Sequence, residues 1–349
     1  MAAERIAALE DAREHWDRLA EGAGHPFATW EWISTWWSWF GGGRELYTFI
    51  CRDADDAVVA ILPLYVASNR PVRVARFVGY ESLNSPLCAP EHRPLAAAAL
   101  RELIGSGSGR CRLFYAEGLP GMQGWDEHLG GRLIATHTDP VIRLEGRSWD
   151  EFLDSRTKKL RGKIRYEERR LGRDHELSFR LSDDPERLGE DMETLFRLHR
   201  IRWGEEATGV FAGERARMHR EVAERMLERG WLRLWIEEVD GVPAAAYYGF
   251  RYAGSEWFFQ SGRDPSFDRL SVGAVLLSHV IRNACEEGVE DFRFLEGGES
   301  YKTRLADDDY ESQTRLLGSG AVGRAALIVV SAVQSAPDPV RARVMRFVR

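Results

Sequence analysis

The segment FLEGGESYKTRLA, Phe294–Ala306, places titratable side chains directly after an apolar run and a pair of glycines. Glu296 and Glu299 are candidate general bases, and Tyr301 is a candidate general acid. Lys302 is suited to stabilising a developing negative charge or to binding a phosphate group. On turn chemistry alone, an exposed Gly-Gly turn at the end of a strand is the more usual interpretation of these residues.

The segment DRLSVGAVLLSHV is a second candidate site, because its pattern predicts the start of a helix. The first turn of a helix has free N–H groups and the positive end of the helix dipole, which together bind anions such as phosphate. Ser271, Gly273 and Ala274 occupy this start, and Arg269 comes just before it. The alternative is purely structural, with Ser271 capping the helix and Gly273 allowing close packing.

The stretch Arg156–Arg173 carries nine basic and two acidic residues, a net charge of +7 in a chain whose net charge is −7. A solvated helix face is the usual explanation for a run of charges. Here the excess of one sign favours an anionic partner, such as a phosphopantetheine arm, an acyl-carrier protein, a tRNA acceptor stem or a lipid-linked sugar phosphate. Arg161 and Arg165 lie four positions apart and share one helix face, so we expect them to bind substrate.

Composition restricts the class of protein. A chain of 349 residues is long for one core, so two domains are expected, and the net negative charge argues against DNA as a partner. The four cysteines have no C-x-x-C spacing, which favours buried free thiols over a metal site.

The chain ends give no sign of a membrane span. The first residues are charged throughout, and the longest apolar run, Ala325–Val333, is too short to cross a bilayer, so we expect a cytoplasmic protein without a transmembrane segment. Gly318–Arg349 is expected to form a helix and a basic tail, with five arginines and one aspartate. Such a tail is suited to peripheral membrane contact.

One order of elements occurs twice: helix, hairpin, strand, helix, strand. The predicted hairpins are Glu45–Ala67 and Trp231–Gly254, and the helices that follow are Pro94–Gly107 and Ser271–Gly288. The offset of about 180 residues indicates two copies of a domain rather than a solenoid. Mixed strands and helices in this order predict an α/β fold with a partly antiparallel sheet.

This pattern resembles the acetyltransferase fold of the GNAT superfamily, in tandem. Over nearly the whole chain the sequence is similar to CelD-type proteins, and the resemblance is carried by SWDEFLDSRTKKLRGKIRYEERRL, LHRIRW, GVPAAAYYGF, SGRDPSFDRLSVGAVLL and FLEGGESYKTRLA. It implies a mixed sheet flanked by helices in each copy. The expected domains are residues 1–147, residues 148–317, and a C-terminal helix and tail over residues 318–349.

The resemblance implies an N-acyltransferase. The enzyme would move an acyl group, acetyl or longer, from the thioester of coenzyme A (CoA) or an acyl-carrier protein to an amine on a small or sugar-linked acceptor, without a permanently bound cofactor. Cell-envelope or polysaccharide biosynthesis is the implied setting. Two alternatives stay open: a Fem-like aminoacyltransferase that uses aminoacyl-tRNA, and a non-catalytic accessory protein of exopolysaccharide synthesis.

The resemblance also assigns roles to the candidate residues. Catalysis is expected of Lys302, Tyr301, Glu299 and Glu296. The N-terminal copy is expected to be degenerate for cofactor, because no glycine pair follows the corresponding strand and Pro94 lies near the helix start. The expected cofactor-binding residues are Arg269, Ser271, Gly273, Ala274 and Gln260.

Overall fold

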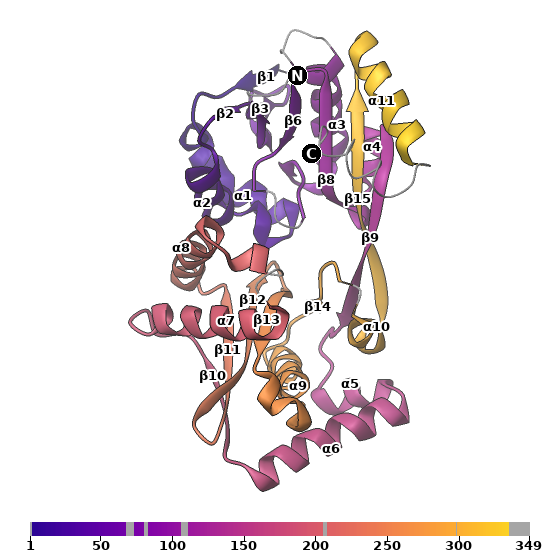
Figure 1. Ribbon diagram of the computed structural model, residues 1–349. Helices are drawn as coiled ribbons and strands as arrows, with labels where there is room; N and C mark the ends of the chain where they lie inside the picture. The colour runs from indigo at the N-terminus through magenta and orange to yellow at the C-terminus, as the bar shows by residue number, and fades with distance from the viewer. Residues whose placement is uncertain are drawn as a thin grey trace. The chain divides into compact units, whose positions relative to one another are not determined.

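The structure is a computed structural model that describes residues 2–67, 73–79, 83–105, 111–204, 208–297 and 299–334. The chain forms two compact units (Figure 1). Unit 1 comprises Met1–Thr138 and Tyr310–Arg349, and unit 2 comprises Asp139–Asp309. Strands β9 (Arg132–Arg143) and β15 (Asp308–Gly318) each begin in one unit and end in the other.

Unit 2 is built on a mixed sheet with the strand order β10-β11-β12-β13-β14-β9. Neighbouring strands are antiparallel except for β13 and β14, which are parallel. The strands introduced here are β10 (Leu177–Leu181), β11 (Leu232–Val239), β12 (Val242–Tyr252), β13 (Ser255–Arg263) and β14 (Asp291–Arg293).

Strands β13 and β14 pair over three residues only, from Ser255 with Asp291 to Trp257 with Arg293. Strand β14 ends there, whereas β13 continues to Arg263. The edge of β13 beyond Trp257 is therefore not paired with β14.

Helices cover both faces of the unit 2 sheet (Figure 1). Successive residues of a strand point to opposite faces, and β12 shows this clearly. The Tyr247 side chain packs in the core cluster with α9, whereas the Tyr248 ring contacts Phe211 and His219 on the α7 and α8 side. The helices are α5 (Trp149–Ser155), α6 (Lys158–Asp174), α7 (Leu188–Trp203), α8 (Glu214–Glu228), α9 (Val272–Glu286) and α10 (Ser300–Leu305), with 3-10 turns at Thr208–Phe211 and Pro265–Leu270.

Helix α7 lies directly on the backbone of β13. A Cβ added at Gly262 would lie 2.3 Å from the backbone N of His199, so glycine is required for this contact. The close approach fixes the position of the last turn of α7, which carries Arg202.

Unit 1 contains two sheets, with strand orders β1-β3-β4-β7 and β15-β8-β6-β5-β2. The strands are β1 (Ala2–Arg5), β2 (Arg44–Leu46), β3 (Phe49–Arg52), β4 (Val58–Leu62), β5 (Leu64–Ala67), β6 (Val74–Phe77), β7 (Leu87–Cys88) and β8 (Leu113–Pro120). The helices are α1 (Arg13–Ala23), α2 (Trp30–Phe40), α3 (Arg93–Gly105), α4 (Trp125–Leu129) and α11 (Gly320–Gln334), with 3-10 turns at Leu9–Ala12, Pro26–Ala28, Pro90–His92 and Gly121–Gln123.

The α/β fold with mixed sheets flanked by helices is confirmed. The hairpin predicted at Trp231–Gly254 is β11 and β12, and the helix predicted at Ser271–Gly288 is α9. In the first copy, the predicted helix forms as α3, although its last predicted residues, 106 and 107, lie outside the described part of the chain. The domains expected from the sequence, residues 1–147 and 148–317, follow the repeat and stay a prediction. The compact units place residues 310–317 in unit 1, because β15 pairs with β8 there.

All four cysteines are free and buried, as expected, and burial raises the pKa of the Cys51 and Cys88 thiols to about 12. Within the described ranges, no helix combines the length and the apolar character needed to cross a membrane. The expected C-terminal helix forms as α11, and most of the expected basic tail, residues 335–349, lies outside the described residues.

Candidate functional site

A cavity of about 280 Å3 lies in unit 2 between α6, α9, α10 and the strands β12 and β13. One part of its wall is apolar. Helix α6 contributes Leu160 and Ile164, helix α9 contributes Leu276 and Leu277, and β13 contributes Phe258. The cavity reaches the segment of β13 that continues beyond its pairing with β14.

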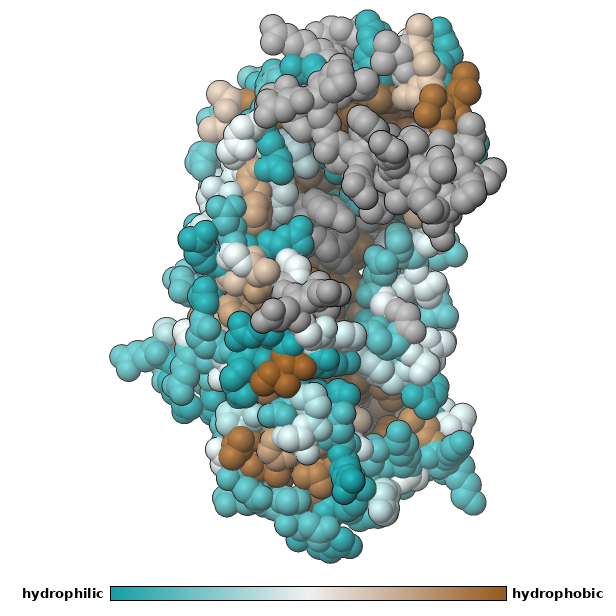
Figure 2. Space-filling model, in the orientation of Figure 1, coloured by the Kyte–Doolittle hydropathy of each residue, from teal (hydrophilic) through white to brown (hydrophobic). Residues whose placement is uncertain are grey.

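Helix α6 turns one face toward the cavity. Leu160, Lys163, Ile164 and Glu167 line it, which is the spacing of a helical face. Thr157 caps the helix, because its hydroxyl accepts a hydrogen bond from the Leu160 N–H. The outer surface over α6 is hydrophilic (Figure 2). The basic stretch noted in the sequence is therefore an amphipathic helix whose cavity face carries two apolar residues, Leu160 and Ile164, and two charged residues, Lys163 and Glu167.

Four cations line the cavity: Lys163, Arg202, Arg263 and Arg304. Arg202 donates a hydrogen bond of 2.7 Å to Ser261 Oγ, and burial lowers its pKa. Among the residues that the structure describes, no carboxylate forms an ion pair with Arg202. A partly desolvated guanidinium without a carboxylate partner favours an anionic or oxyanionic ligand.

The start of α9 lies at the cavity, and Gly273 and Ala274 line it. Ser271 occupies the N-cap position with a φ of 60°, but its hydroxyl does not cap the helix. Instead Ser271 Oγ donates a hydrogen bond of 2.9 Å to Glu167 Oε1. This hydrogen bond holds α6 against the start of α9, and the Nζ of Lys163, also on α6, lies 3.7 Å from the same Glu167 oxygen.

Three expected cofactor-binding residues, Arg269, Gln260 and Ser271, lie outside the cavity lining. The Arg269 side chain is exposed, and its backbone carbonyl accepts a hydrogen bond from Arg170. Gln260 contacts the ring of His199, a buried histidine whose pKa burial lowers to about 4. Arg263 lines the cavity near Gly273, and its Nε lies 3.2 Å from Asp268 Oδ1.

Lys302 is buried, with 3% of its surface exposed. Its Nζ donates hydrogen bonds to the carbonyl oxygens of Phe294 (3.3 Å) and Glu296 (3.4 Å) and lies 3.1 Å from Glu299 Oε2. Burial lowers the pKa of Lys302, and the Glu299 carboxylate opposes that shift. A Cβ added at Gly297 would lie 2.3 Å from this Nζ, so the glycine makes room for the ammonium group.

Helix α10 presents Tyr301, Arg304 and Leu305 to the cavity, while Lys302 lies away from it. Burial raises the pKa of the Tyr301 hydroxyl, and the nearby Glu299 carboxylate adds to this effect. The hydroxyl therefore stays protonated at neutral pH. Glu296 is exposed and Glu299 is half-buried, and neither lines the cavity.

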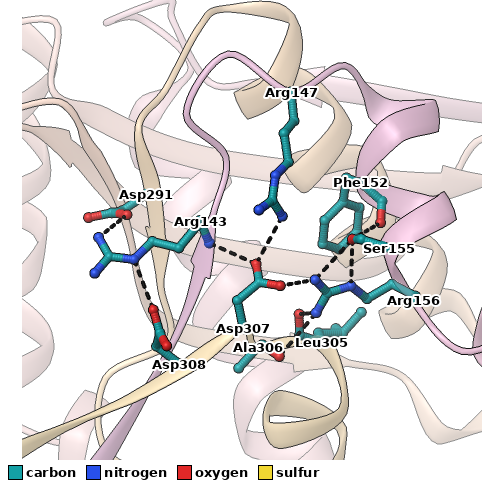
Figure 3. Close-up of polar contacts among 10 residues, drawn as sticks. All are labelled: Arg143, Arg147, Phe152, Ser155, Arg156, Asp291, Leu305, Ala306, Asp307 and Asp308. Carbon is teal, nitrogen blue, oxygen red and sulfur yellow. Dashed lines mark hydrogen bonds and ion pairs between the residues drawn. The ribbon is translucent and has the colours of Figure 1, made fainter.

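The end of α10 is fixed by an ionic network (Figure 3). The Arg156 guanidinium donates hydrogen bonds to the carbonyl oxygens of Leu305 (2.7 Å) and Ala306 (3.0 Å) and pairs with Asp307. Asp307 also accepts from the backbone N–H of Arg143 and the side chain of Arg147. These contacts position the helix that carries Tyr301.

The predicted substrate-binding pair lies elsewhere on α6. Arg161 Nη1 lies 3.3 Å from Asp154 Oδ1, and Arg165 Nη2 lies 3.3 Å from Asp150 Oδ1. Both arginines thus contact α5, and neither lines the cavity. Among the residues that the sequence argument missed are Lys163, Arg202, Ser261, Arg263 and Arg304. All five lie within quoted motifs: Lys163 in the basic stretch, Arg202 in LHRIRW, Ser261 and Arg263 in SGRDPSFDRLSVGAVLL, and Arg304 in FLEGGESYKTRLA.

Comparison with known proteins identifies a family and similar solved structures. Residues 158–303, which contain most of the cavity-lining elements, match the family described as acetyltransferase (GNAT) domain. No curated protein matches the sequence at a significant level.

Solved structures match nearly the whole chain. FemX is similar with 11% identity and a TM-score of 0.62, covering 90% of this chain and 95% of the other. L-PGS from Bacillus licheniformis has 12% identity and a TM-score of 0.58, covering 97% and 100%. A tandem GNAT protein from the clavulanic acid biosynthesis pathway has 14% identity and a TM-score of 0.50, covering 91% and 98%.

The chain has the tandem GNAT fold. The GNAT part of the sequence resemblance is therefore confirmed, together with the structural likeness to FemX, whereas the likeness to CelD-type proteins stays a prediction.

Proposed function

We propose that unit 2 is an N-acyltransferase whose cavity binds a thioester donor, either acyl-CoA or an acyl-carrier protein, and that its acceptor is an amine. The main supporting observation is Arg202, a partly desolvated cation without a carboxylate partner in the described residues, in a cavity that reaches the part of β13 beyond its pairing with β14. The start of α9 and the cations Lys163 and Arg263 offer a place for the donor phosphates. The match of residues 158–303 to the GNAT domain supports the same reaction class.

The proposed reaction is a direct transfer. The acceptor nitrogen attacks the thioester carbonyl carbon, a C–N bond forms, and the C–S bond breaks. Tyr301 faces the cavity with a protonated hydroxyl, so it donates a proton to the leaving thiolate. Arg202 stabilises the oxyanion of the tetrahedral intermediate.

The proton of the attacking amine needs a base. Glu299 is our first candidate, because its carboxylate is close enough to influence the Tyr301 pKa; since it does not line the cavity, it would take the proton through one water molecule. Glu296 is the second candidate, at the exposed start of the same loop. Lys302, which is held by two carbonyl groups and Glu299, acts in this proposal by positioning that loop.

A thiol-release assay with acetyl-CoA and a panel of small and sugar-linked amines tests this function. Wild-type protein should release CoA thiol only when an acceptor amine is present. Tyr301→Phe should lower kcat by roughly 100-fold, the usual size of a general-acid effect, with little change in donor Kd. Tyr166→Phe is the matched control, because Tyr166 is exposed on α6 and does not line the cavity.

Two outcomes would redirect the proposal. A Tyr301→Phe variant with wild-type kcat would refute the general-acid role. No thiol release with any amine would favour the accessory-protein alternative or another donor.

The second candidate function is aminoacyl transfer from aminoacyl-tRNA. The basic stretch of α6 and the likeness to FemX favour it. Tight, salt-sensitive binding of tRNA without binding of CoA would support this alternative. The pathway, including a role in polysaccharide or cell-envelope biosynthesis, stays a proposal that rests on the CelD-type sequence resemblance.

A further inference from the structure

The lining of the unit 2 cavity has a polar and an apolar part. Gly273 and Ala274 at the start of α9 and the Arg263 side chain belong to the polar part. Leu160 and Ile164 of α6 and Leu276 and Leu277 of α9 form the apolar part of the same lining. Ile164, Leu276 and Leu277 also belong to the main hydrophobic cluster of unit 2, so the apolar part is an indentation of the core.

We infer that this apolar part holds the acyl chain of the donor and that the chain is longer than acetyl. The inference rests on the proposed function, and it names the class of acyl group. An acetyl group adds one methyl group beyond its carbonyl, which would cover little of an apolar lining that comprises Leu160, Ile164, Leu276, Leu277 and Phe258.

The energetics of an apolar cavity support this assignment. Empty space lined by leucine, isoleucine and phenylalanine destabilises a protein, because the lining atoms lose packing contacts and water gains few hydrogen bonds there. A ligand chain would recover those contacts. The cations lie around the same cavity, so it suits an amphiphile with an apolar chain and an anionic or polar remainder.

Helix α6 offers a way to fill the apolar part while leaving Gly273, Ala274 and Arg263 unchanged. Leu160 is half-buried at the first turn of α6 and lines the cavity. Leu160→Trp would fill the apolar part, and Leu160→Ala would enlarge it. Tyr166→Trp introduces the same side chain on α6 at a position that is 56% exposed, so it is the matched control.

The experiment is calorimetric titration of the full chain with CoA and with acetyl-, butanoyl-, hexanoyl- and octanoyl-CoA. Wild-type affinity should rise from acetyl- to hexanoyl-CoA, by up to roughly fourfold for each methylene group that becomes buried. Leu160→Trp should bind CoA as wild type does but lose the dependence on chain length. Leu160→Ala should move the optimum to a longer chain, and Tyr166→Trp should behave as wild type.

The titration distinguishes a wrong acyl-chain assignment from a wrong donor assignment. Binding of acetyl-CoA with equal or higher affinity than hexanoyl-CoA would overturn the acyl-chain inference and leave the donor assignment in place. If no CoA compound binds, CoA as donor is wrong. The longer chains are then tested as butanoate, hexanoate and octanoate, where binding that Leu160→Trp abolishes supports the acyl site and absence of binding overturns it.

Discussion

At the scale of single residues, Glu237 shows how burial changes a carboxyl group. It lies in β11 and is fully buried, and among the described residues none forms a hydrogen bond of normal geometry with its carboxyl oxygens. Burial raises its pKa to about 9, although a weaker interaction with the backbone of Leu276 in α9 opposes the shift. The side chain is therefore neutral at physiological pH in the folded protein and ionised in the unfolded one.

This difference predicts how stability depends on pH. The folded pKa is above the unfolded one, so the folded state binds the extra proton between about pH 4.5 and 9. The contribution of the protonated Glu237 side chain to the free energy of unfolding is fully present below pH 4.5. It is lost as the pH rises toward 9, and the free energy of unfolding falls by up to about 1.4 kcal/mol per pH unit.

Glu237→Gln should remove that slope and raise the free energy of unfolding at pH 8. Denaturant unfolding at pH 5 and pH 8 measures both effects. Glu238→Gln, the partly exposed neighbour in the same strand, is the control and should keep the wild-type slope. A Glu237→Gln variant with an unchanged slope would contradict this account.

At the scale of elements, the sequence patterns predicted the periodic segments well. The alternation in Trp231–Gly254 corresponds to β11 and β12, and the apolar helix after Ser271 is α9. Helix α10 was not predicted, because its six residues follow a Gly-Gly turn and carry little periodic signal. Its end is held by distant contacts from Arg156, which no local pattern reveals.

The loop before α10 depends on Lys302. Lys302→Met would leave Glu299 and two carbonyl groups without their shared cation, so we expect a loss of about 3 kcal/mol in the free energy of unfolding. Thermal and denaturant unfolding measure the loss, and Thr303→Ala, the next and exposed residue, is the control.

The result also separates two roles for this lysine. A destabilised Lys302→Met variant whose stability is partly restored by adding Glu299→Gln would support the positioning role. A variant with wild-type stability and no turnover would instead show that Lys302 acts on the reacting groups.

At the scale of the whole molecule, the two-copy pattern in the sequence correctly predicted the tandem fold. It did not predict that β15 contributes to unit 1, because the pairing of β15 with β8 joins residues about 200 positions apart. The residues of the candidate site were also only partly predicted from the sequence. Tyr301, Gly273 and Ala274 were predicted and line the cavity, whereas Arg202 and Arg263 are brought there by α7 and β13, whose packing a single sequence does not specify.

The central claim is that the cavity of unit 2 binds a thioester donor through the cations that line it. Calorimetric titration with acetyl-CoA tests it most directly, using Arg202→Ala and Arg263→Ala, with Arg269→Ala as the matched control on an exposed arginine near the start of α9. The account predicts micromolar binding by wild type and Arg269→Ala, and at least tenfold weaker binding by Arg202→Ala and Arg263→Ala. Undiminished binding by both cavity variants, or weakening by Arg269→Ala alone, would contradict it.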